Sequence, residues 1–323
     1  MPLWSSRSQA LSSAQRPSSR LQTTRRRVLV IANPAAGTLK QKKVNRTILQ
    51  LERLGCTVAL RETAFPGDGE AIARNANPAE FDVVVAAGGD GTINEVANGL
   101  AGRPIALGIL PLGTANVMAI ETGISRSPEK AAEVIATGNP VTVYTGQVAS
   151  EAASPMGGPR RFVMMAGAGF DAHVVDTVDL ALKRRTGAFA YVWGTLHKAF
   201  KYDFPPITVE VDGGPPQTGA TVVVCKGAHY GGPFLGAPDA DILDPSFQVV
   251  IMQRKGILNA LRYGWGLVTG RFNKFPDVTI QKATHVRLSG PGALPLQGDG
   301  DTMAHLPVTI SIAPEPVDVV MPV

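Results

Sequence analysis

One glycine-rich stretch, Gly88-Gly89-Asp90-Gly91-Thr92, has the residue types and spacing that suit phosphate binding. Glycines permit positive φ angles and let the backbone approach a ligand closely. The stretch lies between an apolar run at 81–87 and a helix-like segment at 92–100. A strand, a glycine turn and a helix start together aim free backbone N–H groups at one point, which favours an anion. The alternative is a tight turn without a ligand, but that turn gives Asp90 no evident task.

The residues after the glycines carry their own helix-start signal. Thr92-Ile93-Asn94-Glu95 fits the capping-box pattern, in which a threonine and a glutamate three residues later each satisfy a backbone N–H group. The pattern predicts that Thr92 caps a helix over 92–100.

Two more loops rich in small and polar residues follow apolar runs. Asn33-Pro34-Ala35-Ala36-Gly37 follows the run at 28–32, and Pro111-Leu112-Gly113-Thr114-Ala115-Asn116 follows the run at 105–110. In an open parallel sheet, loops at the carboxyl ends of the strands converge on one ligand-binding crevice. The three loops therefore predict a phosphate-bearing ligand. No G-x-x-x-x-G-K-[ST] sequence occurs, so a P-loop nucleotide site is excluded.

Phosphoryl transfer also needs carboxylates that bind a metal and a base that accepts the proton of the attacking hydroxyl. Asp90 is the first candidate. Asp299-Gly300-Asp301 offers a second carboxylate site late in the chain. Because Asp-Gly is common in turns, a surface turn is the simpler interpretation of this segment from residue types alone.

Three further sets of residues have weaker patterns. Asp239, Asp241 and Asp244 suit Mg²⁺ or Ca²⁺, although a solvated acidic loop explains them equally well. The stretch 167–172 fits G-x-G-x-x-A, but no strand-end acid lies about 20 residues further on, so a structural turn or a loop facing the cleft is preferred to a dinucleotide site. The histidines show no zinc-ligand spacing.

The loops must be positioned by alternating strands and helices. Strand-like runs at 28–32, 57–63, 81–87 and 105–110 alternate with helical patterns, which indicates a parallel α/β sheet. After about residue 140, short β-like runs between Pro- and Gly-rich turns indicate an antiparallel sandwich or open barrel. We therefore expect an α/β domain at 27–140 and a β-rich domain at 141–305.

Charge and composition exclude several classes of protein. Six arginines within residues 1–27 account for the basic character of the chain, because the net charge of +5 falls to −1 without them. A basic body that binds nucleic acid is therefore not expected. Residues 1–26 are expected to form a disordered basic tail, with a transit peptide or a weak membrane anchor as alternatives. Two cysteines fit a reducing, cytosolic compartment, and no stretch predicts a transmembrane helix.

Taken together, these motifs resemble the diacylglycerol kinase, sphingosine kinase and ceramide kinase family, especially its bacterial soluble lipid kinases. The resemblance extends from Arg27 to the C-terminus. Its carriers, in order, are Asn33-Pro34-x-x-Gly37, Gly88-Gly89-Asp90-Gly91-Thr92 with Asn94-Glu95, and Pro111-Leu112-Gly113-Thr114-x-Asn116. The resemblance implies a Rossmann-like nucleotide-binding domain, a sandwich-like β domain, and an active site in the cleft between them. Residues 306–323 would pack back on the first domain.

The resemblance also implies roles for individual residues. Asp90 would organise the ATP phosphates and Mg²⁺. Asp301 stands where the family has a glutamate as general base, and its shorter side chain reduces the reach by about 1.5 Å. The loop 238–244 resembles the family's second Mg²⁺ loop, with Asp241 and Asp244 as ligands, but Pro245-Ser246 departs from its pattern. The residues implied to contact ATP are Asn33, Gly37, Thr63, Gly88, Gly89, Asp90, Gly91, Thr92, Glu95, Gly113, Thr114 and Asn116.

The implied activity is transfer of the γ-phosphoryl group of ATP to a hydroxyl of a diacylglycerol-like or sphingoid lipid. The enzyme would be cytoplasmic and peripheral at the inner membrane surface, with the lipid tail along 174–200 beside the cations Lys183-Arg184-Arg185. A homodimer is left open. The alternatives are an NAD kinase, which shares the G-G-D-G loop, and a nucleotide- or lipid-binding regulator that lost catalysis through Asp301. A dehydrogenase based on 167–172 is the most distant alternative.

Overall fold

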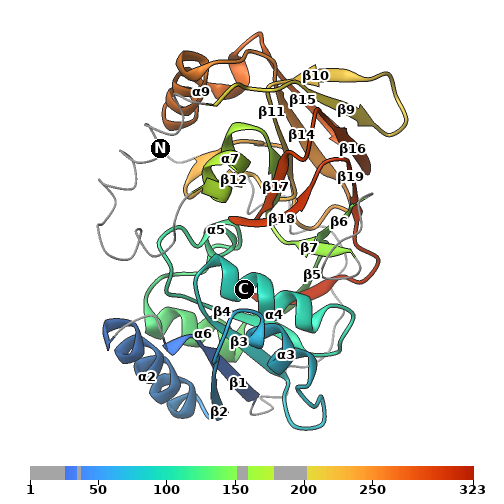
Figure 1. Cartoon of the computed structure of the whole chain (residues 1–323). Helices are drawn as coiled ribbons and strands as arrows, with labels where there is room; N and C mark the ends of the chain where they lie inside the picture. The colour runs from blue at the N-terminus through green and yellow to red at the C-terminus, as the bar shows by residue number, and fades with distance from the viewer. Residues whose placement is uncertain (1–25, 35–37, 151–158, 178–201) are drawn as a thin grey trace.

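The computed structural model describes residues 26–34, 38–150, 159–177 and 202–323. The chain forms an α/β unit, in which helices flank one sheet, and a β unit built from two antiparallel sheets (Figure 1). This arrangement confirms the predicted fold class, an α/β domain combined with a second, sandwich-like β domain.

The sheet of the α/β unit has the strand order β2-β1-β3-β4-β20-β5. Strands β2, β1, β3, β4 and β20 all run parallel to one another. The edge strand β5 is antiparallel to its neighbour β20. The bounds are β1 Arg27–Ala32, β2 Thr57–Glu62, β3 Val83–Gly88, β4 Ala106–Pro111, β5 Asn139–Val143 and β20 Val317–Met321. Because β2 and β3 lie on opposite sides of β1, the strand order reverses there. Such a reversal creates a crevice outside the carboxyl ends of the strands.

Helices cover both faces of this sheet (Figure 1). Strands β3 and β4 are buried at every residue, which is typical of a parallel sheet between two helical layers. Helix α2 packs against α6, and α3 packs against α4. The helix bounds are α2 Thr38–Arg53, α3 Asp68–Arg74, α4 Asp90–Leu100, α5 Val117–Glu121 and α6 Pro128–Thr137.

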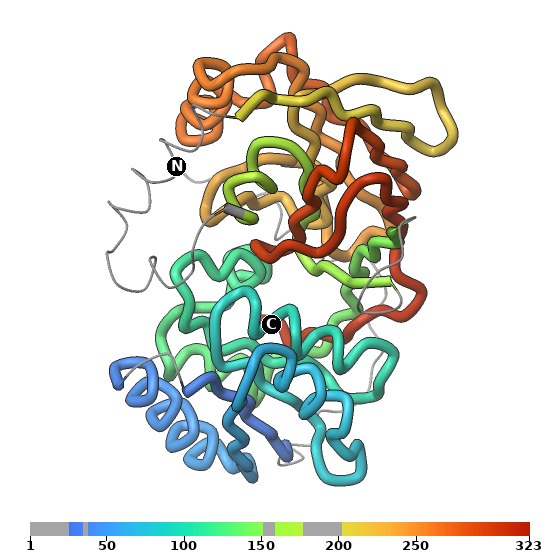
Figure 2. The backbone as a smooth tube through the Cα atoms, in the orientation of Figure 1, coloured from blue at the N-terminus to red at the C-terminus, as the bar shows by residue number. Residues whose placement is uncertain are grey.

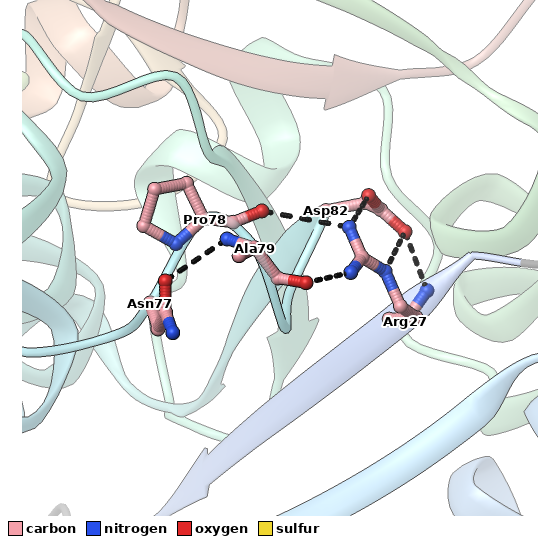
Figure 3. Close-up of polar contacts among 5 residues, drawn as sticks. All are labelled: Arg27, Asn77, Pro78, Ala79 and Asp82. Atoms are coloured by element: carbon pink, nitrogen blue, oxygen red, sulfur yellow. Dashed lines mark hydrogen bonds and ion pairs between the residues drawn. The ribbon is translucent and has the colours of Figure 1, made fainter.

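The amino ends of β1 and β3 are held together by an ion pair (Figure 3). Arg27, the first residue of β1, places Nη2 2.6 Å from Oδ1 of Asp82, the residue before β3. The same guanidinium donates to the carbonyls of Pro78 and Ala79. Hydrogen bonding from Arg27 lowers the pKa of Asp82. These contacts lie at the amino ends of the strands. The candidate binding loops follow the carboxyl ends of the same strands, at the opposite edge of the sheet.

The β unit consists of two six-stranded antiparallel sheets packed face to face. Their orders are β10-β9-β16-β19-β6-β7 and β15-β14-β11-β8-β17-β18. Buried side chains from both sheets, such as Val209 and Val222, form one core between them. The bounds are β6 Gly146–Ser150, β7 Arg160–Phe162, β8 Met165–Ala168, β9 Ile207–Val211, β10 Gln217–Gly219, β11 Thr221–Cys225, β14 Phe247–Met252, β15 Val278–Ala283, β16 His285–Ser289, β17 Pro295–Gly298, β18 Asp301–His305 and β19 Val308–Ile312.

Smaller elements lie around these sheets. Helix α7 spans Phe170–Thr177 and follows β8, and helix α9 spans Ile257–Val268 and precedes the short 3-10 helix η2, Phe272–Lys274. Strands β12, His229–Tyr230, and β13, Phe234–Leu235, form a two-stranded ribbon.

The chain crosses between the two units twice, as the smooth trace of Figure 2 shows. The first crossing separates β5 from β6, so the continuous run expected at 141–148 is divided between the two units. The second separates β19 from β20, which returns the C-terminal end to the α/β sheet. The two crossings are bonded to each other, because the Ala313 amide donates to the Thr145 carbonyl at 2.8 Å.

Candidate active site

The parallel strands deliver most of the candidate residues to one edge of the sheet. Asn33 follows β1, Thr63 follows β2, Gly88 ends β3, and Gly113 lies two residues beyond β4. The Thr63 amide donates to the Ala32 carbonyl, which ties the ends of β1 and β2 together. Gly37 and its two preceding alanines lie outside the described residues.

Two of the glycine loops approach each other closely. A Cβ added to Gly113 would lie 2.6 Å from the Gly89 Cα, and one added to Gly88 would lie 2.3 Å from Thr92 Oγ1. Neither Gly88 nor Gly89 nor Gly113 has a positive φ. The glycines are therefore required by close packing and not by a left-handed backbone.

Asp90 and Asn116 fix the geometry between these loops. The Asp90 carboxylate accepts hydrogen bonds from the amides of Asn116 at 2.9 Å and Val117 at 2.6 Å. Asn116 is fully buried with a φ of 53°. Its side chain accepts from the Gly113 amide and donates to the Gly113 carbonyl. Asp90 thus has a structural task, which is to hold the start of α5 against the glycine loop.

The expected capping box is wrong. Helix α4 begins at Asp90 with Gly89 as its N-cap, and no side chain caps it. Glu95 instead accepts from the amides of Gly67 at 2.9 Å and Gly69 at 3.0 Å. Glu95 therefore orients the turn between Thr63 and α3, at the rim of the candidate site.

Thr114 takes part in a contact of the neighbouring loop. The carbonyls of Thr114 and Ala115 both accept hydrogen bonds from the Arg126 guanidinium, at 2.7 and 2.8 Å. This contact supports the loop on the side away from Gly89.

The late Asp-Gly-Asp segment forms the tip of a hairpin and faces the glycine loop. Asp299 and Gly300 connect β17 to β18 with φ angles of 51° and 91°, the positive values typical of a two-residue hairpin turn. Asp301, the next residue, is exposed. A Cβ added to Gly91 would lie 3.7 Å from Asp301 Oδ2. The structure therefore brings the candidate base of the β unit to the candidate phosphate loop of the α/β unit.

Asp299 is the residue that holds this hairpin in place. Its carboxylate accepts from three consecutive amides, Val163 at 2.6 Å, Met164 at 2.9 Å and Met165 at 3.1 Å. It also accepts from Asn94 Nδ2 of α4 at 2.7 Å, a contact between the two units. Burial raises the pKa of Asp299, and these hydrogen bonds oppose that rise. The motif Asp299-Gly300-Asp301 predicts a carboxylate site or a turn but not this anchoring role of Asp299, because its partners lie more than 130 residues away.

A second buried hydrogen-bond network, centred on Gln297 and Asp171, supports the same hairpin. Gln297 accepts from the Gly300 amide at 3.0 Å and donates to Asp171 Oδ2 at 3.1 Å. Asp171 also accepts from the Tyr230 hydroxyl at 3.2 Å. Burial raises the pKa of Asp171. A Cβ on Gly167 would lie 2.3 Å from Asp171 Oδ2, so the G-x-G-x-x-A stretch accommodates this carboxylate.

The loop expected to bind a second metal holds a lysine. Lys226 is fully buried, and its ammonium donates to the carbonyls of Asp241 and Asp244, each at 2.6 Å. The Asp244 carboxylate pairs with Lys282 at 2.7 Å, and Asp241 accepts from the Leu243 amide. Burial lowers the pKa of Lys226 to about 8. Two cations of the chain thus lie against this loop, Lys226 on its main-chain carbonyls and Lys282 on the Asp244 carboxylate, and Asp241 and Asp244 as Mg²⁺ ligands stay a prediction. Within the described ranges, no group of three or more His, Cys, Asp or Glu side chains could hold a metal.

The segment expected to contact the lipid tail lies mostly outside the described residues. The described residues that flank this segment form an aromatic cluster. The rings of Phe170 and Phe204 are 5.5 Å apart, and those of His173 and Tyr202 are 4.5 Å apart. Burial raises the pKa of Tyr202 to about 12. Among the helices that the structure describes, none is long and apolar enough to cross a membrane.

Comparisons with known proteins agree with this geometry. The model of the diacylglycerol kinase catalytic domain matches residues 27–148. The model of the YegS C-terminal, NAD kinase beta sandwich-like domain matches residues 164–321.

Relatives with known names cover almost the whole chain. A diacylglycerol kinase from Bacillus subtilis (strain 168) is 29% identical over 303 residues, which are 92% of this chain and 97% of that protein. One from Staphylococcus aureus (strain Newman) is 28% identical over 302 residues, which are 92% of this chain and 93% of that protein.

Solved structures share the fold. A crystal structure of a diacylglycerol kinase from Bacillus anthracis str. Sterne superposes with a TM-score of 0.70 at 20% identity, covering 92% of this chain and 97% of that one. The two family models together account for both units, and the relatives align with 92% of the chain. The chain belongs to the diacylglycerol kinase catalytic-domain family, and it is a lipid kinase.

Proposed function

We propose that this enzyme transfers the γ-phosphoryl group of ATP to the hydroxyl of a diacylglycerol-like lipid. The observation that carries the proposal is the position of Asp301 Oδ2 beside Gly91, since it joins a candidate base to a candidate phosphate loop. The names of the relatives favour diacylglycerol as the acceptor. A sphingoid lipid is the alternative acceptor within the same chemistry.

The proposed ATP site is the carboxyl edge of the α/β sheet. Backbone N–H groups in the first turn of α4 lack intrahelical partners and form the positive end of the helix dipole, so they suit the binding of phosphates. The close contact of Gly113 with Gly89 leaves no room for a side chain at Gly113 and brings the two loops together at this edge. The residues proposed to line the site are Asn33, Gly37, Thr63, Gly88, Gly89, Asp90, Gly91, Thr92, Glu95, Gly113, Thr114 and Asn116.

Asp301 would accept the proton of the lipid hydroxyl as that oxygen attacks the γ-phosphorus. Asp301 would also lie close to Mg²⁺ that enters with ATP, since its Oδ2 lies beside Gly91. Both oxygens of the Asp90 carboxylate accept from the amides of Asn116 and Val117, so Asp90 would organise the phosphates and Mg²⁺ through the loop that it holds in place. When bound with ATP, Mg²⁺ would neutralise the charge that develops on the phosphates. Asp299 and Gln297 would hold the hairpin so that Asp301 keeps its orientation. The acceptor lipid requires the enzyme to work in the cytoplasm, peripherally at the inner membrane surface.

The test is transfer of label from [γ-³²P]ATP to diacylglycerol in mixed micelles with Mg²⁺. Asp301→Asn should lower kcat by roughly 10²- to 10⁴-fold, since a general base contributes on that order. Glu133→Gln, which neutralises an exposed carboxylate on α6, is the matched control and should leave kcat unchanged. Full activity of Asp301→Asn would rule out the assigned base.

An NAD kinase remains the second candidate, because the matched sandwich domain is described as NAD kinase-like. Offering NAD and diacylglycerol together as acceptors, with one limiting supply of ATP, separates the two. We expect the label in the lipid. Label in NADP alone would replace the proposal.

A further inference from the structure

Helix α9 lies at the end of the β unit farthest from the α/β unit (Figure 1), and it carries a stripe of exposed apolar side chains. Four large side chains of this helix are between half and four-fifths exposed: Leu258 79%, Leu261 50%, Trp265 67% and Val268 61%. Their spacing of three, four and three residues places them along one side of the helix. Tyr263 and Gly266, which are buried, anchor the opposite side.

The stripe is flanked by cations at both ends. Arg254 and Lys255 precede the helix, Arg271 and Lys274 follow it, and all four are exposed. The sequence has no acidic residue between Asp244 and Asp277. Asp277 is itself buried, where it pairs with Arg262 and, at 3.6 Å, with Arg254, and accepts from the Tyr263 hydroxyl. The segment 245–276, which contains the stripe, is therefore apolar and positively charged.

We infer that α9 is a docking surface for an anionic lipid bilayer. A helix with apolar side chains on one face and cations beside them lies in the plane of the membrane interface, with the apolar face among the acyl chains. Tryptophan favours this interface because its ring is apolar and its N–H is polar. Basic residues near anionic headgroups add an attraction that weakens with salt.

A second copy of the chain is a poorer occupant. In a two-fold contact between α9 helices, either antiparallel or parallel, the cations that flank one helix meet cations of the other. Like charges at such short range oppose association. The same charges favour an anionic membrane, so charge complementarity selects the bilayer.

This inference rests on the proposed function only in that a membrane-borne acceptor gives docking a purpose. Docking would hold the enzyme at the surface where the lipid resides. The surface itself lies outside the candidate active site, so its loss and the loss of catalysis can be measured separately.

The test is co-sedimentation of the full chain with vesicles, without ATP. Wild type should bind vesicles of phosphatidylglycerol and phosphatidylcholine, should bind pure phosphatidylcholine weakly, and should be released by high salt. The double variant Leu258→Ser/Trp265→Ser should bind the anionic vesicles about tenfold or more weakly. Leu49→Ser, which removes a similarly exposed leucine (54%) from α2, should bind as wild type does.

Activity assays then separate docking from catalysis. Phosphorylation of diacylglycerol in vesicles should fall in the double variant, and phosphorylation in detergent micelles should not. Binding of the double variant to anionic vesicles at wild-type strength would overturn the docking surface. A wild-type dimer that the double variant converts to a monomer would also overturn it, in favour of a second copy. Vesicle binding by a wild-type protein that phosphorylates no lipid would leave docking intact and refute the proposed function.

Discussion

At the scale of single residues, the two aspartates of the hairpin, Asp299 and Asp301, differ in burial and in hydrogen-bond partners. Asp301 is exposed and faces the glycine loop, whereas Asp299 points inward and accepts four hydrogen bonds. A short-range sequence motif thus contains one residue that we propose as the base and one that positions the hairpin on which the base lies. The distinction depends on burial and on distant partners.

The length of the Asp301 side chain gives the first prediction. Asp301→Glu should raise kcat by roughly 10- to 100-fold, because an error of about 1 Å in a reacting group costs on the order of 10²-fold. The measurement is steady-state transfer of label to micellar diacylglycerol. A gain shows that the wild-type aspartate falls short of the hydroxyl. A drop in kcat would show instead that this cleft is shaped for an aspartate.

The Asp299 network gives the second prediction. Asp299→Asn should lower the free energy of unfolding by about 1–3 kcal/mol. The asparagine would place an N–H donor where a carboxylate oxygen now accepts, so the backbone amides bonded to that oxygen would lose their acceptor. Urea unfolding measures the change. Asp176→Asn is the control, since Asp176 is exposed and, among the residues that the structure describes, accepts one hydrogen bond at 3.2 Å, from Thr302 Oγ1 of β18. The control should stay within about 0.5 kcal/mol of wild type. Equal losses in both variants would deny Asp299 its special role.

At the scale of elements, the close contact between the turns after β3 and β4 shapes the candidate phosphate site. The Gly113 Cα faces the Gly89 Cα with no room for a side chain between them. Asp90 and Asn116 then fix the start of α5 against the same turn. The two loops therefore behave as one rigid unit.

Gly113→Ala tests this rigidity. The added methyl group would lie 2.6 Å from backbone, so the loops must separate, and we expect a loss of about 1–3 kcal/mol in stability together with weaker ATP binding. Thermal unfolding and ATP titration measure the two effects. Gly264→Ala, on a helix with open space around it, should instead be neutral or stabilise by up to about 1 kcal/mol. Unchanged ATP affinity in Gly113→Ala would show that the contact is not needed for binding.

The sequence predicted the strands and the order of the loops well, because these depend on local signals. Apolar runs and glycine turns are visible within a few residues, and parallel topology follows from their alternation. The capping box failed because Glu95 has partners in another loop, the amides of Gly67 and Gly69.

The parts of the site that the sequence missed all depend on contacts between distant segments. Asp299, Gln297 and Asp171 gain their roles from partners on other strands or in the other unit. The buried Lys226 was also missed, because it reaches the main-chain carbonyls of the predicted metal loop from 15 and 18 residues away. A local pattern of carboxylates does not reveal that a cation of the chain binds the backbone of the same loop.

At the scale of the whole molecule, a second contact joins the two units at the end of α5. The Glu121 carboxylate accepts from the amides of Ala228 and His229, each at 3.1 Å, and lies 2.5 Å from the His229 ring nitrogen Nδ1. Its side chain is only 9% exposed. The contact lies on the opposite end of α5 from Asp90, so this short helix links the glycine loop to the β unit.

This contact predicts a pH dependence of stability. Burial acts to raise the pKa of Glu121, but hydrogen bonds from His229 and Ala228 outweigh it and hold that pKa below its usual value. The unfolded chain therefore binds the proton more readily than the folded one. The contribution of Glu121 is fully present above the pKa of an unfolded glutamate, about 4.3, and is lost as the pH falls through the lower folded pKa.

Glu121→Gln isolates that contribution. The variant should lose about 1–3 kcal/mol at neutral pH, as expected for hydrogen bonds to a charged group. It should lose less further stability than wild type between pH 5 and pH 3, because the ionised carboxylate is already gone. Thermal unfolding across this range measures both, with Glu133→Gln as the exposed control. The titratable groups that interact with Glu121 are His229, Lys226 and Cys225, and all three are retained in the variant. Parallel curves for Glu121→Gln and wild type below pH 5 would show that other groups cause the acid loss, and that α5 does not join the two units through this carboxylate.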